Sequence, residues 1–404
     1  MMWKDEMKPR HFLLAGLLVL SGISGGQDNA AGPNDSTTKA VTAASAFIAT
    51  LTPDQTPRVV YDYDSPMKPK WNNLPPNMAA RAGIPLGSLS DSQRDLALAV
   101  VRSVVSAYGY RKMMDVIDAD AEFGRTGAGF PTGLNAYMLA VFGKPSLTEP
   151  WEIQFNGHHL GLNVTIVGKN NVMAPTMVGA YPNIYQKNGR EFHVLGEESA
   201  RAIALMQSLN PQQQAKATIT SVVGDYVLGP GHDGEVLSPE GLKATEMTAG
   251  QKETLAQLAS PWINIINEPV AAAKMAEIRR NIDDTYFAWS GKPDAGEKAY
   301  FRMQGPTVWI EFAPQNSGFG APGGGGRGRG RAGRGGSGGA GASGGQFQGR
   351  GPGGAAGPSG RDSRVGNGGQ PNVTGVVLAE RDPNHIHSVY RDFTNDYAKR
   401  FARR

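Results

Sequence analysis

Apolar residues recur at helical spacing in several stretches of the chain. These stretches cover residues 90–117, 197–209, 211–218, 248–266 and 269–282. Ser90 and Gln93 have the spacing of a capping box, in which two side chains bond free backbone groups at the start of a helix. Thr248 and Gln251 have the same spacing. Both positions are therefore predicted helix starts.

Between residues 151 and 178 the period changes to that of a strand. Trp151, Ile153 and Phe155 alternate with polar residues, which predicts a long hairpin returning through residues 172–178. Further strands are predicted at residues 285–289, 298–303, 306–312, 373–378 and 386–390. Since strands enclose a helical middle region, the predicted fold class is α+β, with an antiparallel sheet from distant chain segments packed against that region. No regular internal repeat is evident.

The amino-acid composition excludes several kinds of metal and catalytic site. The 404 residues include no cysteine, which excludes disulfides, thiolate zinc sites, iron–sulfur clusters and cysteine nucleophiles. The formal net charge of +4 is concentrated in residues 317–370, where 25 glycines accompany seven arginines and one aspartate. This stretch carries +6, so the remainder carries −2 and has no bias toward nucleic acid or anionic membranes.

Residues 317–370 have two interpretations that differ in function. Arginine–glycine tracts bind RNA when interleaved aromatic residues stack on the bases, but Phe319 and Phe347 are the only aromatic residues in this stretch. A disordered insertion in a surface loop explains the composition more simply, because the entropy of loop closure grows slowly with length. We therefore expect a disordered Gly/Arg-rich insertion and no nucleic-acid partner.

The first 26 residues have the layout of a signal peptide. Three basic residues precede a short apolar run at residues 12–20, and small residues follow up to position 26. The run is too short for a membrane span, which needs roughly 20 residues, although an uncleaved anchor is the alternative. We expect export to the periplasm or the extracellular space and no membrane association after cleavage. A flexible leader is expected at residues 27–56, followed by a single α+β domain at residues 57–404 that the insertion interrupts.

Histidine is the most informative residue type, because the signatures of serine hydrolases, phosphate-binding loops and zincins are absent. His385 and His387 would present both rings on one face of a strand. Such a pair can supply two ligands to Zn, Cu, Fe or Mn, unless one of the rings bonds a buried backbone group instead. The adjacent His158 and His159 would face opposite sides of a strand. At most one of them is expected in the same site, unless Gly157 forms a bulge.

Two further residues are candidates for a fourth ligand or a general base. Glu311 lies between aromatic and aliphatic neighbours in a predicted core strand. A buried carboxylate needs a partner, which is either a metal or an arginine such as Arg302 or Arg391. His232 lies beside Asp233 in a glycine-rich loop, a sequence that also fits an ordinary turn.

A series of short motifs occurs in a characteristic order. They are GHHLGLN at residues 157–163, PTMVGAYP at 175–182, GPGHDG at 229–234, YFAWSG at 286–291, YFRMQGP at 300–306, IEF at 310–312, HIHSVYRD at 385–392 and NDY at 395–397. In these motifs the chain resembles the domain of unknown function 3500 family, exported proteins of bacteria and some fungi. The resemblance implies no activity, but the family pattern includes the paired histidines, the HIH element and the glutamate strand. The family has a shorter connection where this chain has residues 315–371, which supports the insertion.

Three hypotheses follow. The first is an exported metal-dependent enzyme, hydrolytic or oxidative, in which both histidines of the HIH element and one of the adjacent pair bind a divalent metal. Glu311 or His232 would complete that site. Four aromatic residues would line a cleft for a small carbohydrate or aromatic ligand, unless they belong to the core: Tyr286, Trp289, Tyr300 and Trp309. The second hypothesis is a non-catalytic exported binding protein whose histidines are structural, and the third is an RNA or surface-polymer binder acting through the arginine tract.

Overall fold

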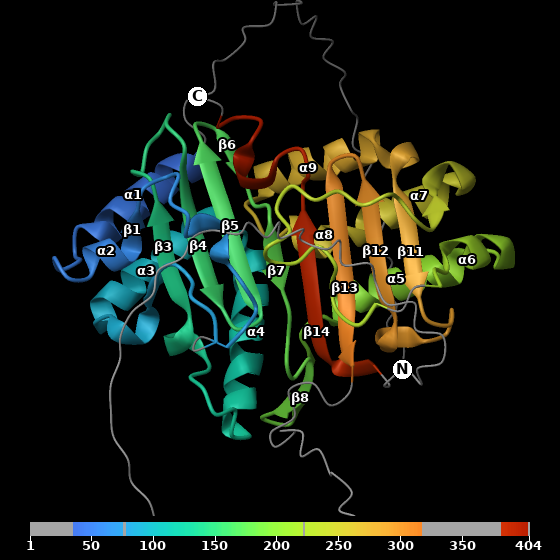
Figure 1. The fold of residues 1–404 in the computed structure, drawn as a ribbon, viewed down its shortest axis with the longest axis horizontal. Helices are drawn as coiled ribbons and strands as arrows, with labels where there is room; N and C mark the ends of the chain where they lie inside the picture. Colours follow the sequence, from blue (N-terminus) through green and yellow to red (C-terminus); the bar gives the residue numbers. More distant parts are fainter. Residues whose placement is uncertain (1–34, 76–77, 221–222, 317–380, 403–404) are drawn as a thin grey trace, which may run out of the picture.

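A mixed, largely antiparallel sheet of 12 strands dominates the computed structural model, which describes residues 35–75, 78–220, 223–316 and 381–402 (Figure 1). Its main path runs through β1 (Val60–Tyr61), β3 (Met138–Phe142), β4 (Trp151–Gly157), β5 (Leu160–Val167), β7 (Thr176–Val178), β14 (Arg381–Arg391), β13 (Val308–Asn316), β12 (Tyr300–Gly305), β11 (Tyr286–Ser290) and β10 (Leu242–Lys243). Off this path, β2 (Ile84–Pro85) pairs with β3, and β6 (Asn170–Val172) pairs with β5. β8 (Ile184–Lys187) and β9 (Arg190–His193) form a separate hairpin.

Helices cover one face of the sheet and two long loops cross the other (Figure 1). The helices are α1 (Asp35–Ile48), α2 (Thr56–Val59), α3 (Asp91–Val104), α4 (Ala107–Arg125), α5 (Gly196–Ser208), α6 (Pro211–Ala217), α7 (Ala249–Leu258), α8 (Ser260–Ile263) and α9 (Glu268–Arg280). The loops are the β1–β2 loop (residues 62–83) and the α6–β10 loop (residues 218–241). Helices and a largely antiparallel sheet together confirm the predicted α+β class. No helix within the described residues is long and apolar enough to cross a membrane.

The predicted helix starts are confirmed. Ser90 caps α3 and Thr248 caps α7, and each forms the reciprocal capping box with the glutamine three residues later. The first helical stretch divides after Val104, and the side chain of Ser106 accepts a hydrogen bond from Gly109 N at the start of α4.

Residues 35–48 were expected to belong to a flexible leader, and that expectation is wrong for this segment. They form α1, in which Ala40, Ala44 and Phe47 are fully buried and pack in the same hydrophobic core as α3. These three residues lie on one face of the helix, and their burial stabilises it. The helix is hard to predict from sequence, because most of its residues are small or polar. The expected signal peptide, the Gly/Arg-rich insertion and the strand at residues 373–378 lie outside the described residues.

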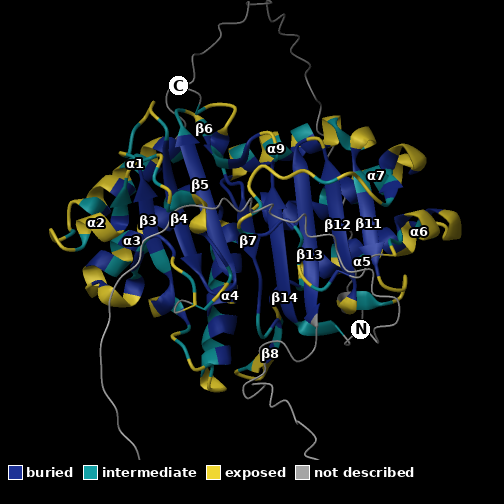
Figure 2. Cartoon of the chain, viewed as in Figure 1, coloured by how far each residue is buried: buried dark blue, intermediate teal, exposed yellow. Residues whose placement is uncertain are grey.

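The loop-covered face of the sheet is polar and nevertheless buried. On β4, Ile153 and Phe155 face the main hydrophobic core, whereas Gln154 and Asn156 point to the opposite face and are also shielded from solvent. Figure 2 shows the central strands buried along their length. The β1–β2 loop contributes to this cover, since Gln154 Nε2 donates to the Lys68 carbonyl at 2.8 Å.

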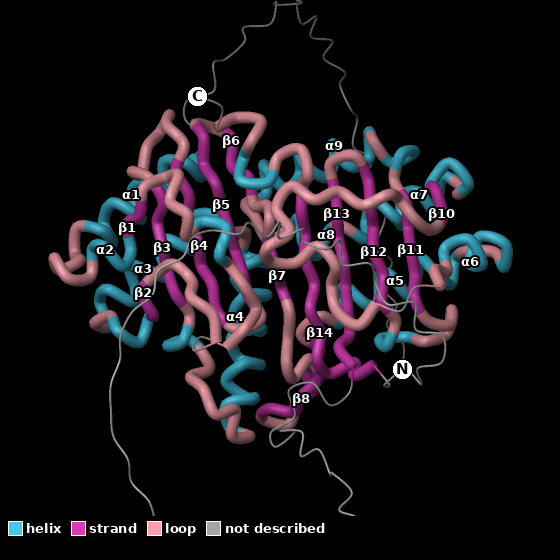
Figure 3. The backbone as a smooth tube through the Cα atoms, in the orientation of Figure 1, coloured by secondary structure: helices cyan, strands magenta, loops and turns pink. Residues whose placement is uncertain are grey.

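The sheet contains an internal repeat, which corrects the expectation that none is present. β2, β3, β4, β5 and β7 have the same order and pairing as β10, β11, β12, β13 and β14. Helices lie behind both halves of the sheet, on either side of the β7–β14 junction (Figure 3). In one half Ile84 pairs with Leu139, and in the other Leu242 pairs with Phe287. The halves meet where Thr176 pairs with Tyr390.

Side-chain contacts repeat as well. Gln93 donates to the Thr50 carbonyl at 2.8 Å, and Gln251 donates to the Ser208 carbonyl at 2.7 Å. Gln93 also bonds Gln55, just before α2, and Gln251 also bonds Gln213 in α6. The repeat is therefore present in local hydrogen bonding as well as in strand order.

Candidate metal centre

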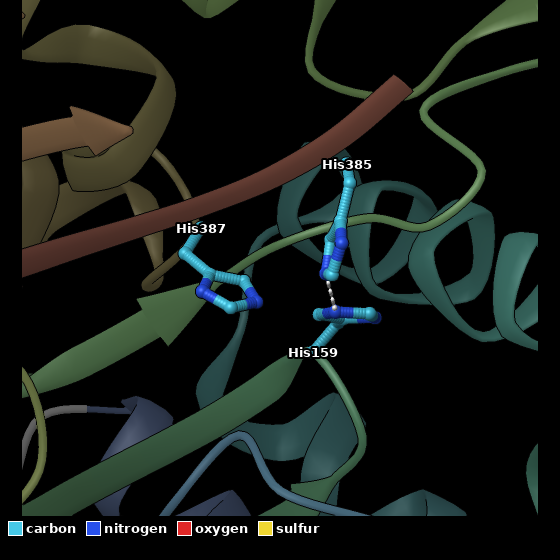
Figure 4. A group of neighbouring side chains, drawn as sticks. All are labelled: His159, His385 and His387. Atoms are coloured by element: carbon cyan, nitrogen blue, oxygen red, sulfur yellow. Dashed lines mark hydrogen bonds between the residues drawn. The ribbon is translucent and has the colours of Figure 1, made fainter. Parts of the chain in front are cut away.

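Three histidine rings converge at the end of the sheet where β14 passes the β4–β5 turn (Figure 4). His385 and His387 lie on one face of β14 with ring centroids 4.9 Å apart. His159 Nε2 lies 3.1 Å from His385 Nε2, and its ring centroid is 5.3 Å from that of His387. One nitrogen from each ring lies within 4.8 Å of the others, and all three residues are buried.

The adjacent histidines form a turn, which corrects the expectation that they face opposite sides of a strand. Gly157 pairs with Leu160, so His158 and His159 are the two residues that connect β4 and β5. His159 has a φ of 64°, in the left-handed region, and the two rings lie together with centroids 3.8 Å apart. The turn requires glycine at 157, because a Cβ there would lie 2.4 Å from the Tyr137 ring.

A buried carboxylate orients His158. Asp120 on α4 contacts His158 Nδ1 at 2.8 Å through one oxygen and accepts from Gly133 N at 2.8 Å through the other. Asp120, His158 and His159 form a second group whose candidate ligand atoms lie within 4.8 Å of one another. The two groups share His159, so both adjacent histidines lie beside the HIH element.

Asp225, from the α6–β10 loop, orients His387 in the same way. Its Oδ1 lies 2.9 Å from His387 Nδ1 and also accepts from Gln315 Nε2 at 2.9 Å. Partial desolvation opposes the ionisation of Asp225, whose side chain is 47% exposed, but the hydrogen bond and the electrostatic interaction with His387 outweigh it and lower the pKa of the carboxyl. An ionised acceptor at Nδ1 keeps the proton there and leaves the lone pair on Nε2. Asn73 Nδ2 lies 3.3 Å from that Nε2.

His159 is held as a neutral imidazole. Burial lowers its pKa well below the usual 6.5, and the neighbouring His158, His385 and His387 lower it further. Its Nδ1 is buried and has no hydrogen-bond partner among the described residues. A neutral ring is in the protonation state that a metal ligand requires, and Nε2 is the nitrogen that faces His385.

These residues fit a divalent transition metal. Bonds of about 2.0–2.1 Å from each imidazole nitrogen place co-ligand nitrogens about 3.3 Å apart in a tetrahedral site. The 3.1 Å between His159 Nε2 and His385 Nε2 is close to this spacing, and His387 has a ring nitrogen within 4.8 Å of both rings. Carboxylate partners on the far nitrogen of ligand histidines are the usual support of such sites.

Glu311 lies away from this cluster and is bonded elsewhere. Its carboxylate accepts from the backbone N–H groups of Val227 and Leu228, from the Tyr300 hydroxyl at 2.6 Å and from Trp309 Nε1 at 2.9 Å. These donors occupy both oxygens and fasten the α6–β10 loop to the sheet. The two arginines considered as partners bond other acids: Arg302 bonds Glu240, whereas Arg391 bonds Asp233 and Asp396.

The other predicted residues also lie apart from the rings. His232 is half-buried and bonds Glu235 at 3.0 Å, and it belongs to neither histidine group. Trp289, Tyr300 and Trp309 are fully buried. Core burial, rather than the lining of an open cleft, accounts for these three aromatic residues.

Comparison with known families agrees with this picture. Residues 33–331 match the family model described as Protein of unknown function (DUF3500). The chain belongs to this family. The DUF3500 match begins just before α1 and includes both adjacent histidines, whereas His385 and His387 lie beyond its end. No curated protein matches the chain, and no solved structure does.

Proposed function

We propose that this DUF3500 protein is an exported metal-dependent enzyme of the hydrolytic class, with a divalent metal bound by His159, His385 and His387. The observation that carries the proposal is the convergence of three buried imidazoles, one of which is held neutral. Three neutral ligands leave the full charge on the metal, which favours Lewis-acid activation of a bound water. Export rests on the signal-like first 26 residues, which precede the start of the family match.

The chain's own groups have definite roles in this proposal. Asp225 orients His387, and Asp120 keeps His158 beside His159 so that it can accept or return a proton. Tyr181 packs against His385 with ring centroids 4.6 Å apart, which limits water access from that side.

A buried arginine indicates the charge of the substrate. Arg81 is only 7% exposed, forms no ion pair with an acid in the described residues, and has no partner for Nε or Nη1. Its Nη2 donates to Asn72 Oδ1, and the next residue, Asn73, contacts His387. Burial lowers the Arg81 pKa to about 10, which still leaves it charged at neutral pH. An anionic substrate group would supply the missing partner.

Metal stoichiometry tests the proposal. Mature protein reconstituted with Zn, Cu, Fe or Mn and dialysed should retain one ion per chain by inductively coupled plasma mass spectrometry. The His385→Ala/His387→Ala variant should retain none, whereas His232→Ala, which alters a half-buried histidine outside both groups, should match the wild type. Hydrolysis of 4-nitrophenyl esters and phosphodiesters should follow the metal content. Wild-type protein that folds but retains no ion would refute the proposal.

A non-catalytic binding protein is the second candidate, and one contact favours it. The Asn73 amide lies against both ring nitrogens of His387, where a ligand-free metal position would otherwise open. Metal bound without hydrolysis or oxidation of any test substrate would support this candidate over the enzyme.

A further inference from the structure

A cavity of about 410 Å³ lies at the opposite end of the sheet from the histidines. It is bounded by α9, by β6 and by the chain that follows β14, elements that gather at one end of the molecule in Figure 1. Its volume is in the range typical of small-molecule sites.

The internal repeat relates this cavity to the candidate metal centre. The β12–β13 turn at residues 306–307 is the counterpart of His158 and His159 in the β4–β5 turn. Thr165 and Ala313 are equivalent, because each lies five residues after the first paired residue that follows its turn. Thr165 pairs with Val172 and Ala313 pairs with His387, so Val172, between Asn171 and Met173, occupies the position of His387. Asn171 and Met173 line the cavity. The cavity therefore lies beside the segment that corresponds to the start of β14, and no histidine lines it.

One polar group of the cavity has no partner. Tyr390 lines it and is only 4% exposed, and no residue of the described chain bonds its hydroxyl. The surrounding wall is largely apolar, including Ile263, Ile266 and Val270. A hydroxyl that reaches the cavity from an apolar wall without an internal partner favours a ligand that brings a hydrogen-bonding group to that point.

The charges of the cavity leave an excess of cations. Lys274 contacts Asp392 at 2.6 Å and Glu277 at 2.9 Å, and Arg400 bonds the same two acids, so these four charges balance. Arg280 and Lys169 also line the cavity, are exposed, and form no ion pair within the described chain. The rim therefore favours an anion.

We propose that this cavity binds a small aromatic carboxylic acid, with the carboxylate at Arg280 and the ring against the apolar wall, where a polar substituent reaches Tyr390. The proposal is independent of the metal centre, since no proposed metal ligand lines this cavity.

Isothermal titration calorimetry of the full chain with phenylacetate, 4-hydroxyphenylacetate and indole-3-acetate tests this inference. Ala273 lines the cavity, so Ala273→Phe fills it, and Ala272→Phe on the same helix is the matched control. Arg280→Gln removes the rim charge, and Arg279→Gln is its control, because Arg279 bonds Glu253 and does not line the cavity. Tyr390→Phe removes only the hydroxyl.

The wild type should bind at least one of these acids with a Kd below about 1 mM. Ala273→Phe should abolish binding, and Arg280→Gln should weaken it about tenfold. Tyr390→Phe should weaken the binding of 4-hydroxyphenylacetate about fivefold and should hardly change the binding of phenylacetate. Both control variants and His385→Ala/His387→Ala should bind like the wild type. The proposal would be overturned if none of the three acids bound, if neutral phenylacetamide bound equally well, or if Ala273→Phe left binding unchanged.

Discussion

Position 179 shows how closely the surroundings of His159 are fitted. A Cβ on Gly179 would lie 2.7 Å from the Ile386 carbonyl oxygen and 3.2 Å from His159 Cδ2. Gly179→Ala must therefore move either β14 or the His159 ring, and we expect a loss of about 1–3 kcal/mol in the free energy of unfolding together with weaker metal retention. Denaturant titration and metal analysis measure both effects.

The matched control for this substitution is Gly250→Ala. A Cβ on Gly250 meets nothing within 4 Å, and the residue lies in helix α7. Alanine there should leave metal content unchanged and should not destabilise the protein. A Gly179→Ala variant as stable and as metal-rich as this control would show that the ring is not closely held.

The buried His159 also predicts a pH dependence in metal-free protein. Its pKa is lowered in the folded state, so below the usual value of 6.5 the unfolded chain binds a proton that the folded chain does not. Stability should therefore fall as pH decreases from about 6.5 toward the lowered folded pKa, with a slope of up to about 1.4 kcal/mol per pH unit, and should be flat above pH 7.

The comparison that isolates this effect is wild type against His159→Gln, because other groups titrate nearby. Burial raises the Asp396 pKa to about 6, and this carboxyl contributes the opposite trend, with stability rising as pH falls from 6 toward 3.8. Urea titrations from pH 4.5 to 8 should show a smaller loss toward acid in the variant. Parallel curves would mean that His159 is not held neutral.

The separation along the sequence between bonded residues explains which parts of the site could be predicted. The pairing of His385 with His387 depends only on strand period, so the sequence was sufficient to place both rings on one face. Asp120 is 38 residues from His158, and Asp225 is 162 residues from His387. No local pattern connects such partners, because only the folded sheet brings them together.

At the scale of elements, Glu311 tests how the α6–β10 loop is fastened. Glu311→Gln replaces an acceptor oxygen by an amide that faces the N–H groups of Val227 and Leu228. We expect a loss of about 2–4 kcal/mol and faster proteolysis within this loop, since a buried charged acceptor is removed from its donors. Metal content should be unchanged, because Glu311 lies outside both histidine groups.

The control for this loop is Glu235→Gln. Glu235 is exposed on the same loop and bonds only His232. It should leave stability and proteolysis rates as they are. Loss of metal from a folded Glu311→Gln protein would restore Glu311 as a ligand and contradict its structural role.

Two elements show why sequence patterns failed locally. The predicted hairpin was placed with its return at residues 172–178, whereas the chain turns at residues 158–159 and returns along β5. A two-residue turn usually carries Asn-Gly or a similar pair, and histidine in the left-handed region gives no such signal. Helix α1 was missed because alanine forms much of its buried face.

At the scale of the whole molecule, the repeat was present in the sequence but faint. The pattern L-x-P-x-Q occurs at residues 51–55 and 209–213, and GKP occurs at residues 143–145 and 291–293. These matches fall at similar places in the two halves: directly before α2, across the start of α6, and after β3 and β11. Strand order and register were needed to recognise them, because few other positions are identical.

The long insertion should be dispensable for the metal centre. Asn316 pairs with Arg381, so the described chain on the two sides of residues 317–380 ends in adjacent strand positions. Replacing these residues by a short Asn-Gly turn should close the β13–β14 hairpin, with thermal stability and metal content near those of the full chain. Loss of metal, or loss of a polymer-binding activity present in the full chain, would assign a function to the insertion.

X-ray absorption spectroscopy of the metal-loaded full chain can show whether His159, His385 and His387 bind one metal ion. We expect imidazole nitrogens as the main ligands at about 2.0–2.1 Å, with three of them around each ion, and loss of that signal in the His385→Ala/His387→Ala variant. A bound ion surrounded only by oxygen, or a histidine signal that the double variant retains, would show that these three histidines do not form the site.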